Sequence, residues 1–177
     1  MNTLALDRVI IRNEKLEKAI WVSFFVLATA LGAQVRIPLP FTPVPFTLQT
    51  FFVLLSGAML GKKMGGVSQA AYLLLGGVGL PLFTNAGALW GPTGGYIAGF
   101  VAASWLIGVL LEKKWKVFYA FILGDFLLLT CGALNLSFFV GGLKNAIVLG
   151  VVPFLAGDVL KIFAAVSAFN IYKSFRR

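Results

Sequence analysis

Six apolar stretches, separated by short connections, occupy most of the chain between residues 19 and 171. Helices need about 20 apolar residues to cross the hydrocarbon core of a bilayer. Only 12% of the residues are charged, whereas soluble domains average roughly a quarter, so a soluble globular fold is excluded. We predict an all-α membrane protein with six spans, the second and third being short, at Ala19–Gln34, Thr47–Gly61, Gly65–Leu80, Thr93–Leu111, Trp115–Val140 and Asn145–Ile171.

The basic residues lie in alternate connections. Twelve of the fifteen Lys and Arg residues stand in the N-terminal segment, the second and fourth connections and the C-terminal segment. The other connections hold only Arg36 and Lys144. Because cytoplasmic segments carry the excess of Lys and Arg, both termini are predicted to be cytoplasmic. Residues 1–18 form a cytoplasmic segment, either an interfacial helix or a disordered lead-in, and residues 19–177 form one domain in the cell membrane.

The composition excludes several classes of function. The chain has no His and a single Cys, Cys131, so it cannot build a zinc site, a Ser-His or Cys-His catalytic pair or an internal disulfide. The net charge of +9 is spread over the connections rather than gathered on a soluble face, which argues against nucleic-acid binding. The segment "SGAMLGKK" at 56–63 lacks the first Gly and the final Ser or Thr of a nucleotide-binding loop, so the chain is no ATPase.

Two connections on the predicted outer side are unusual. Residues 36–50, "RIPLPFTPVPFTLQT", carry four prolines, which favour extended backbone. Residues 79–96, "GLPLFTNAGALWGPTGGY", mix Gly, Pro, Thr and Asn with aromatic residues. Irregular backbone near membrane depth is tolerated where it is buried in protein or lines a cavity. The two loops are therefore expected either to cover a binding pocket or to be ordinary loops with interfacial aromatics.

Three ionisable residues, Asp125, Asp158 and Lys161, fall inside the predicted spans. Placing such a residue at the centre of a membrane-spanning helix raises the free energy of insertion by about 2.5–3.5 kcal/mol. These three residues are therefore candidates for a functional site. Asp158 and Lys161 are three residues apart and share a helical face. They are predicted either to bind a polar ligand or to form a structural ion pair.

Asp125 and Asp158 also suggest a rival function, an intramembrane aspartyl protease. The two carboxyl groups of such an enzyme share a proton, whereas Lys161 would hold Asp158 ionised. A small channel or a structural membrane subunit is a further alternative.

Small residues at a spacing of four predict close contacts between helices. In the first span the pair is Ala28 and Gly32. Close contact, rather than hydrophobicity, drives helix association in lipid. This strip has few polar partners, so we predict that it faces another protein, although internal packing is the alternative for such strips.

Three motifs, "RIPLPFTPVPFTLQT" at 36–50, "GPTGGY" at 91–96 and "PFLAGDVLK" at 153–161, together resemble the BioY family, the biotin-binding S component of ECF-type vitamin transporters. The resemblance runs from about residue 20 to the C-terminus. It implies a six-helix membrane protein that binds biotin near the outer face and has no catalytic activity or cofactor of its own. It also implies two kinds of partner, a transmembrane coupling protein and two cytoplasmic ATPases.

The resemblance further implies which residues bind the vitamin. Asp158 and Lys161 lie at the biotin site, with Gln49, Asn85 and Tyr96 of the outer loops as companions. Biotin offers ureido N–H donors, an acceptor carbonyl and a carboxylate, which suit a carboxylate and an ammonium group. Its apolar part is expected to meet aromatic side chains, namely Phe41, Phe46, Phe83 and Trp90. The chain departs from the family pattern at Asn135, where an aromatic residue is more usual, and in "TNAGAL" before "GPTGGY", where more glycine is expected.

Overall fold

The computed structural model describes residues 14–85 and 87–175, which form six helices and one short β-hairpin. The elements in chain order are α2 (Glu14–Gln34), β1 (Arg36–Ile37), β2 (Phe46–Thr47), α3 (Gln49–Gly77), α4 (Gly94–Glu112), α5 (Val117–Leu136), α6 (Leu143–Gly150) and α7 (Leu155–Phe175). Most of the predicted interfacial segment lies outside the described residues, and residues 14–18 already belong to α2.

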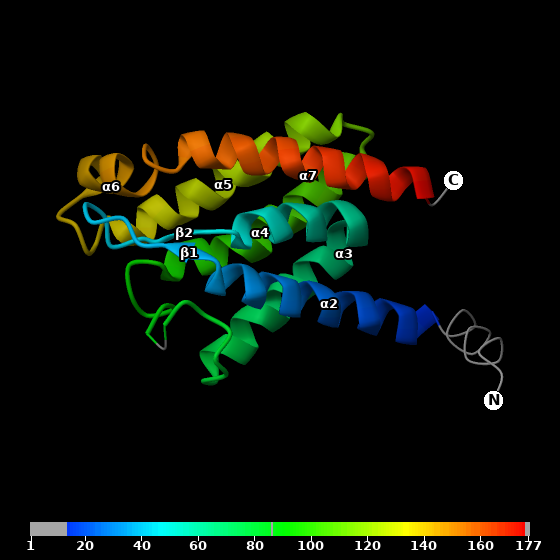
Figure 1. Ribbon diagram of the computed structural model, residues 1–177, viewed down its shortest axis with the longest axis horizontal. Coiled ribbons are helices and arrows are strands. Elements are labelled where there is room, and N and C mark those ends of the chain that lie inside the picture. The colour runs from blue at the N-terminus through cyan, green and yellow to red at the C-terminus, as the bar shows by residue number, and fades with distance from the viewer. Residues whose placement is uncertain (1–13, 86, 176–177) are drawn as a thin grey trace.

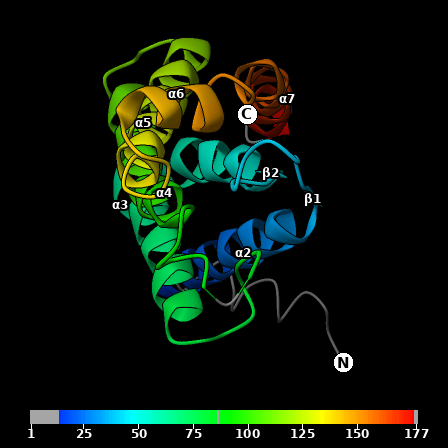
Figure 2. The same cartoon turned by 90° about the vertical axis from the view of Figure 1, so that its left-hand side faces the viewer.

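The helices form a bundle whose two ends differ (Figure 1). The start of α2 and the end of α7 lie at one end, and the β-hairpin, α6 and the loop before α4 lie at the other. The view onto the latter end shows the hairpin passing between α2 and α7 (Figure 2). In the described part of the chain α2, α4, α5 and α7 are long and apolar enough to cross a membrane. The prediction of an all-α fold with helices of membrane-spanning length and apolarity is thus confirmed for these four helices.

The structure differs from the prediction at the second and third spans. They are two helical pieces of α3 that follow each other directly and meet at Gly61, where φ is 73° and ψ is 178°. The two pieces fold back on each other, as the close approach of two glycines shows: a Cβ on Gly65 would lie 2.9 Å from the Cα of Gly57. Glycine suits the turn because a positive φ costs it nothing. The apolar pattern located both pieces but placed three residues, 62–64, between them.

The predicted last span, Asn145–Ile171, is also divided. The short helix α6 ends at Gly150, and α7 begins at Leu155. Pro153 lies between them, and a proline disfavours helical backbone at the residue before it. Hydropathy alone passes over this break because the residues on both sides are apolar.

A buried polar network joins α2, both pieces of α3 and α4. The amide nitrogen of Gln69 donates to the hydroxyl groups of Ser56, at 3.1 Å, and Thr29, at 3.3 Å. The hydroxyl groups of Ser56 and Ser104 are 2.9 Å apart. Hydrogen bonds between helices in an apolar surrounding are typically worth about 0.6–2 kcal/mol. The network fixes how these four helical segments pack against one another.

The structure contradicts the prediction that Ala28 and Gly32 face a partner protein. Ala28 is 6% exposed, and Gly32 is buried against α3. A Cβ on Gly32 would lie 3.0 Å from the ring of Phe52 and 3.1 Å from the backbone nitrogen of Gln49. The strip is therefore an internal contact between α2 and α3. Small residues at a spacing of four predict a close neighbour, but they do not say which helix that neighbour is.

Candidate ligand-binding site

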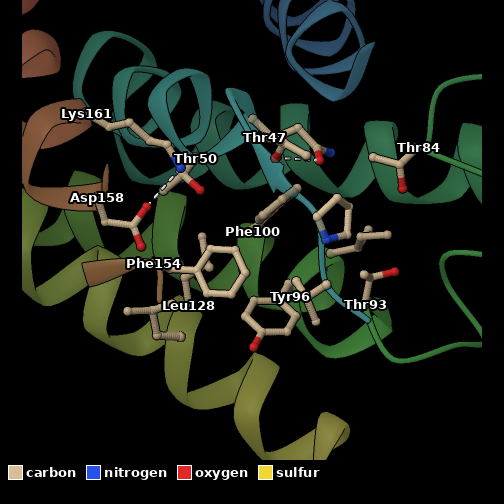
Figure 3. Close-up of a pocket in the computed structure, with 15 residues that line it drawn as sticks. Thr47, Thr50, Thr84, Thr93, Tyr96, Phe100, Leu128, Phe154, Asp158 and Lys161 are labelled. Carbon is tan, nitrogen blue, oxygen red and sulfur yellow. Dashed lines mark hydrogen bonds and ion pairs between the residues drawn. The ribbon is translucent and has the colours of Figure 1, made fainter. Parts of the chain in front are cut away.

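A cavity lies at the hairpin end of the bundle and brings together residues that are far apart in the sequence (Figure 3). Its wall draws on the hairpin, the start of α3, the loop before α4 and helices α4, α5 and α7. Its lining residues are Val44, Pro45, Thr47, Gln49, Thr50, Thr84, Thr93, Tyr96, Ile97, Phe100, Leu128, Leu129, Phe154, Asp158 and Lys161. Four of the five predicted ligand-binding residues are among them.

Asp158 and Lys161 form the charged corner of the cavity. The Lys161 ammonium donates to Oδ1 of Asp158 at 2.9 Å, and both side chains are at most 7% exposed. The ammonium also lies 3.9 Å from the centre of the Phe46 ring, which provides a cation–π contact. The carboxylate keeps further acceptor capacity and the ammonium further donors. This corner can therefore bind a polar group that carries both donors and acceptors.

Tyr96 and Gln49 hold other parts of the wall by bonds to the protein itself. The hydroxyl of Tyr96 donates to the carbonyl oxygen of Gly150 at 2.6 Å, which ties α4 to α6. The amide nitrogen of Gln49 donates to the hydroxyl of Tyr72 at 2.7 Å, and its oxygen accepts from Thr47 at 3.0 Å. Both residues line the cavity as predicted, and each fixes a segment of its wall.

Most of the apolar wall was not identified from the sequence. It is formed chiefly by Phe100 and Phe154, together with leucines of α5. Phe154 stacks on Phe46 with ring centres 6.2 Å apart and an angle of 10°. One signal for Phe154 was available, because it precedes Asp158 by four residues, a spacing that places two side chains on one helical face. Nothing in the motif pattern distinguishes Phe100 from the other apolar residues of α4.

Most of the aromatic side chains that were predicted to meet the apolar part of biotin do not line the cavity. Phe41 and Trp90 are 57% and 80% exposed, and Phe83 is buried against Tyr72. Only Phe46 lies at the charged corner. These side chains sit in long irregular loops, whose path the amino-acid pattern does not determine.

Asn85 is exposed and does not line the cavity, although its neighbour Thr84 does. Its role in ligand binding stays a prediction. Asn135 lies outside the lining too, and its amide nitrogen donates to the carbonyl oxygen of Gly91 at 3.1 Å. It therefore secures the "GPTGGY" segment to α5.

Asp125 lies next to the charged corner, on α5. It is 6% exposed and interacts electrostatically with both Asp158 and Lys161. Its Oδ1 has no hydrogen-bond partner among the described residues. Asp158 is paired with Lys161 and not with Asp125. Among the described residues no three His, Cys, Asp or Glu side chains gather as they would around a metal ion.

The hairpin segment and the loop before α4, which both contribute to the cavity wall, are joined by a hydrogen bond. The guanidinium of Arg36, at the start of the hairpin, donates to the carbonyl oxygen of Thr84 in the loop before α4. The cavity volume is about 50 Å³, whereas small-molecule sites usually measure about 300–1,000 Å³. A ligand of vitamin size therefore enters only if the loops or the wall move apart.

Comparison with known proteins identifies the family. The sequence matches the BioY family over residues 4–177. The chain belongs to the BioY family. Among curated BioY proteins, it is 41% identical to the "Biotin transporter BioY" of Thermotoga maritima over 158 residues, which cover 85% of this chain and 92% of that protein. It is 39% identical to a "Probable biotin transporter BioY" of Pyrococcus horikoshii, over 82% of this chain and 89% of the relative.

The BioY fold is supported by a solved structure as well. The crystal structure of the S component for biotin from an ECF-type ABC transporter matches with a TM-score of 0.84 and 28% identity, over 92% of this chain and 94% of that chain. BioY proteins are transporter components and not enzymes, which removes the protease alternative. In this BioY chain the carboxyl groups of Asp125 and Asp158 therefore belong to a binding protein.

Proposed function

We propose that this chain is the biotin-binding S component of an ECF-type transporter in the plasma membrane. The observation that carries the proposal is the cavity at the hairpin end, in which a buried Asp158–Lys161 pair meets an aromatic wall. The "Biotin transporter BioY" relatives and the biotin S-component fold support biotin as the ligand. The protein binds the vitamin and needs no cofactor.

The chemistry of the cavity suits biotin. Asp158 accepts hydrogen bonds from N–H groups of a ligand, and Lys161 donates to its oxygens. Phe100 and Phe154 pack against the apolar part of the molecule, as is usual for sites with few polar anchors. We include Gln49, Asn85 and Tyr96 in the proposed site, Asn85 by movement of the loop that carries it.

Transport requires partners in this proposal. The sequence contains no nucleotide-binding loop, so the energy for releasing biotin inward comes from ATPases in other chains. We propose a transmembrane coupling protein and two cytoplasmic ATPases as these partners. The Ala28 and Gly32 strip is buried, so the accessible part of α2 is its other face, with Ile20, Phe24, Leu27 and Leu31.

Calorimetric titration of the detergent-purified protein with biotin tests the proposed function. We expect saturable binding of one biotin per chain, and no heat of binding from a vitamin that lacks a ureido ring, such as thiamine. Equal binding of both vitamins, or binding of neither by a protein that is folded by circular dichroism, would rule the proposal out.

Cysteine labelling tests the proposed orientation, with both termini in the cytoplasm. In a Cys131→Ser background, Phe41→Cys and Trp90→Cys should react with an impermeant thiol reagent added to intact cells, because both positions are exposed at the hairpin end. Lys114→Cys, in the connection between α4 and α5, should react only after the cells are permeabilised. The reverse labelling pattern would show that the protein has the opposite orientation in the membrane.

The bond between the two outer loops should control how fast biotin exchanges. Arg36→Ala removes the hydrogen bond to Thr84, and hydrogen bonds to charged groups contribute about 1.5–3 kcal/mol when well formed and less when exposed. We expect association and dissociation rates to rise together by about fivefold in stopped-flow fluorescence, with little change in affinity. The matched control is Lys144→Ala, which removes an exposed positive charge elsewhere. Unchanged rates in Arg36→Ala would show that the loops open without breaking this bond.

A further inference from the structure

A second concave surface lies on the outside of the bundle, away from the biotin cavity. It is a groove of about 540 Å³ between the second piece of α3 and α4. Its lining residues are Lys62, Lys63, Gly66, Val67, Ala70, Ala98, Val101, Ala102 and Trp105. Small residues along its length leave the groove open, and Val67 and Trp105, about half exposed, form raised sides.

The charges in this groove lie at one end only. Lys62 and Lys63 are its only charged lining residues, and both stand directly after the break at Gly61. Lys62 is paired with Glu112 at 2.7 Å, and the exposed Lys63 also interacts electrostatically with that carboxylate, so one net positive charge remains on these three side chains. Three further lysines, Lys113, Lys114 and Lys116, follow Glu112 in the chain. The positive end of the groove is therefore matched to an anionic group, and the rest of it to an apolar one.

The length of the groove indicates which amphipathic molecule fits. From Lys62 to Ala70 the helix rises about 12 Å, at about 1.5 Å per residue. One leaflet of the hydrocarbon core is about 15 Å thick, half of the roughly 30 Å bilayer core. A transmembrane helix of a partner would need a groove along the whole thickness. An acyl chain that runs from a headgroup at the lysines toward the bilayer centre needs only this length.

We infer that the groove binds one acyl chain of an anionic phospholipid, with the phosphate of the headgroup at Lys63. Anionic lipids are enriched in the cytoplasmic leaflet, and each basic residue near the membrane surface attracts them with about 1 kcal/mol. The lysine end of the groove is on the side to which the Lys and Arg distribution assigns the cytoplasm. The lipid site is separate from the biotin cavity, since the two share no lining residue.

Native mass spectrometry of the delipidated protein, titrated with phosphatidylglycerol or phosphatidylcholine of the same chain length, tests this inference. We expect one phosphatidylglycerol to bind at least fivefold more tightly than phosphatidylcholine. Lys63→Ser should lower the affinity for phosphatidylglycerol about fivefold, the change that about 1 kcal/mol corresponds to. Ala70→Leu, which fills the groove, should weaken the binding of both lipids.

Two matched variants separate the groove from general effects. Lys144→Ser removes an exposed positive charge from α6, at the hairpin end of the molecule and outside the groove lining, and should change phosphatidylglycerol affinity less than twofold. Ala19→Leu enlarges an exposed residue on α2, outside the groove, and should leave lipid binding unchanged. An equal effect of Lys63→Ser and Lys144→Ser, or equal affinity for the two lipids, would overturn the inference. So would an Ala70→Leu protein that keeps its lipid but changes its oligomeric state, since the groove would then be a protein interface. Biotin affinity should be unchanged in all four variants.

Discussion

Biotin affinity should fall about a hundredfold to a thousandfold when Asp158 is replaced by Asn or Lys161 by Met. The two side chains pair at 2.9 Å and are at most 7% exposed. Removing one partner of such a pair leaves the other charge buried and uncompensated, which typically lowers the free energy of unfolding by about 3–5 kcal/mol. The same change removes an anchor for the ligand. Calorimetric titration of each variant with biotin measures the loss.

The double variant separates folding from binding. Asp158→Asn with Lys161→Met removes both charges, so neither remains buried alone, and replacing both partners is often close to neutral for stability. We expect its thermal midpoint to recover toward that of the unmodified protein while biotin binding stays lost. Two single variants that fold normally and bind biotin with unchanged affinity would place the site elsewhere.

A single methyl group on α5 should weaken biotin binding about tenfold. In Gly132→Ala the new Cβ would lie 2.1–2.4 Å from three ring carbons of Tyr96, so the ring has to move. The Tyr96 side chain cannot move toward Gly150 either, since its hydroxyl already lies 2.3 Å from where a Cβ on Gly150 would be. The ring is therefore displaced toward the cavity, and overpacking of this kind costs about 1–3 kcal/mol. Titration with biotin and the thermal midpoint measure the two effects.

Gly66→Ala is the matched control for Gly132→Ala. It makes the same replacement inside a helix, but its Cβ would meet the nearest side-chain atom, the Cβ of Trp105, at 3.6 Å, an ordinary contact. Alanine favours helix over glycine by about 1 kcal/mol. The control should thus keep full biotin affinity and an equal or higher midpoint. If Gly132→Ala behaves in the same way, Tyr96 does not depend on this close packing.

The sequence alone predicts the parts of the site in which a charged residue or a proline interrupts an otherwise apolar stretch. Asp158 and Lys161 stand out because ionisable groups are costly in lipid, and their spacing of three predicts the pair that the structure contains. The four prolines of residues 36–50 disfavour a helix, and the segment forms a hairpin in which Arg36 pairs with Thr47, with the prolines in the irregular stretch between the two short strands. In each case a single residue type restricts the conformation strongly.

The sequence did not suffice where many residues are chemically alike. The apolar wall of the cavity and the break within the last predicted span lie largely among Phe, Leu, Ile and Val residues, to which hydropathy assigns similarly apolar values. The environment of Ala28 and Gly32 depends on which helix packs beside α2, a choice made by contacts across the whole bundle. The positions of Phe41, Phe83 and Trp90 depend on loop paths for the same reason.

The turn at Gly61 also determines where the protein tolerates added sequence. Most membrane hairpins offer a loop into which an epitope, a protease site or a fluorescent domain can be inserted. Here the two pieces of α3 meet through one residue, and a Cβ on Gly108 of α4 would lie 2.2 Å from the backbone nitrogen of Lys62, directly after the turn. An insertion at this turn would separate three packed segments at once. The connection between α4 and α5, in which Lys113, Lys114 and Lys116 are exposed, is the better internal point for a reporter at this end of the bundle.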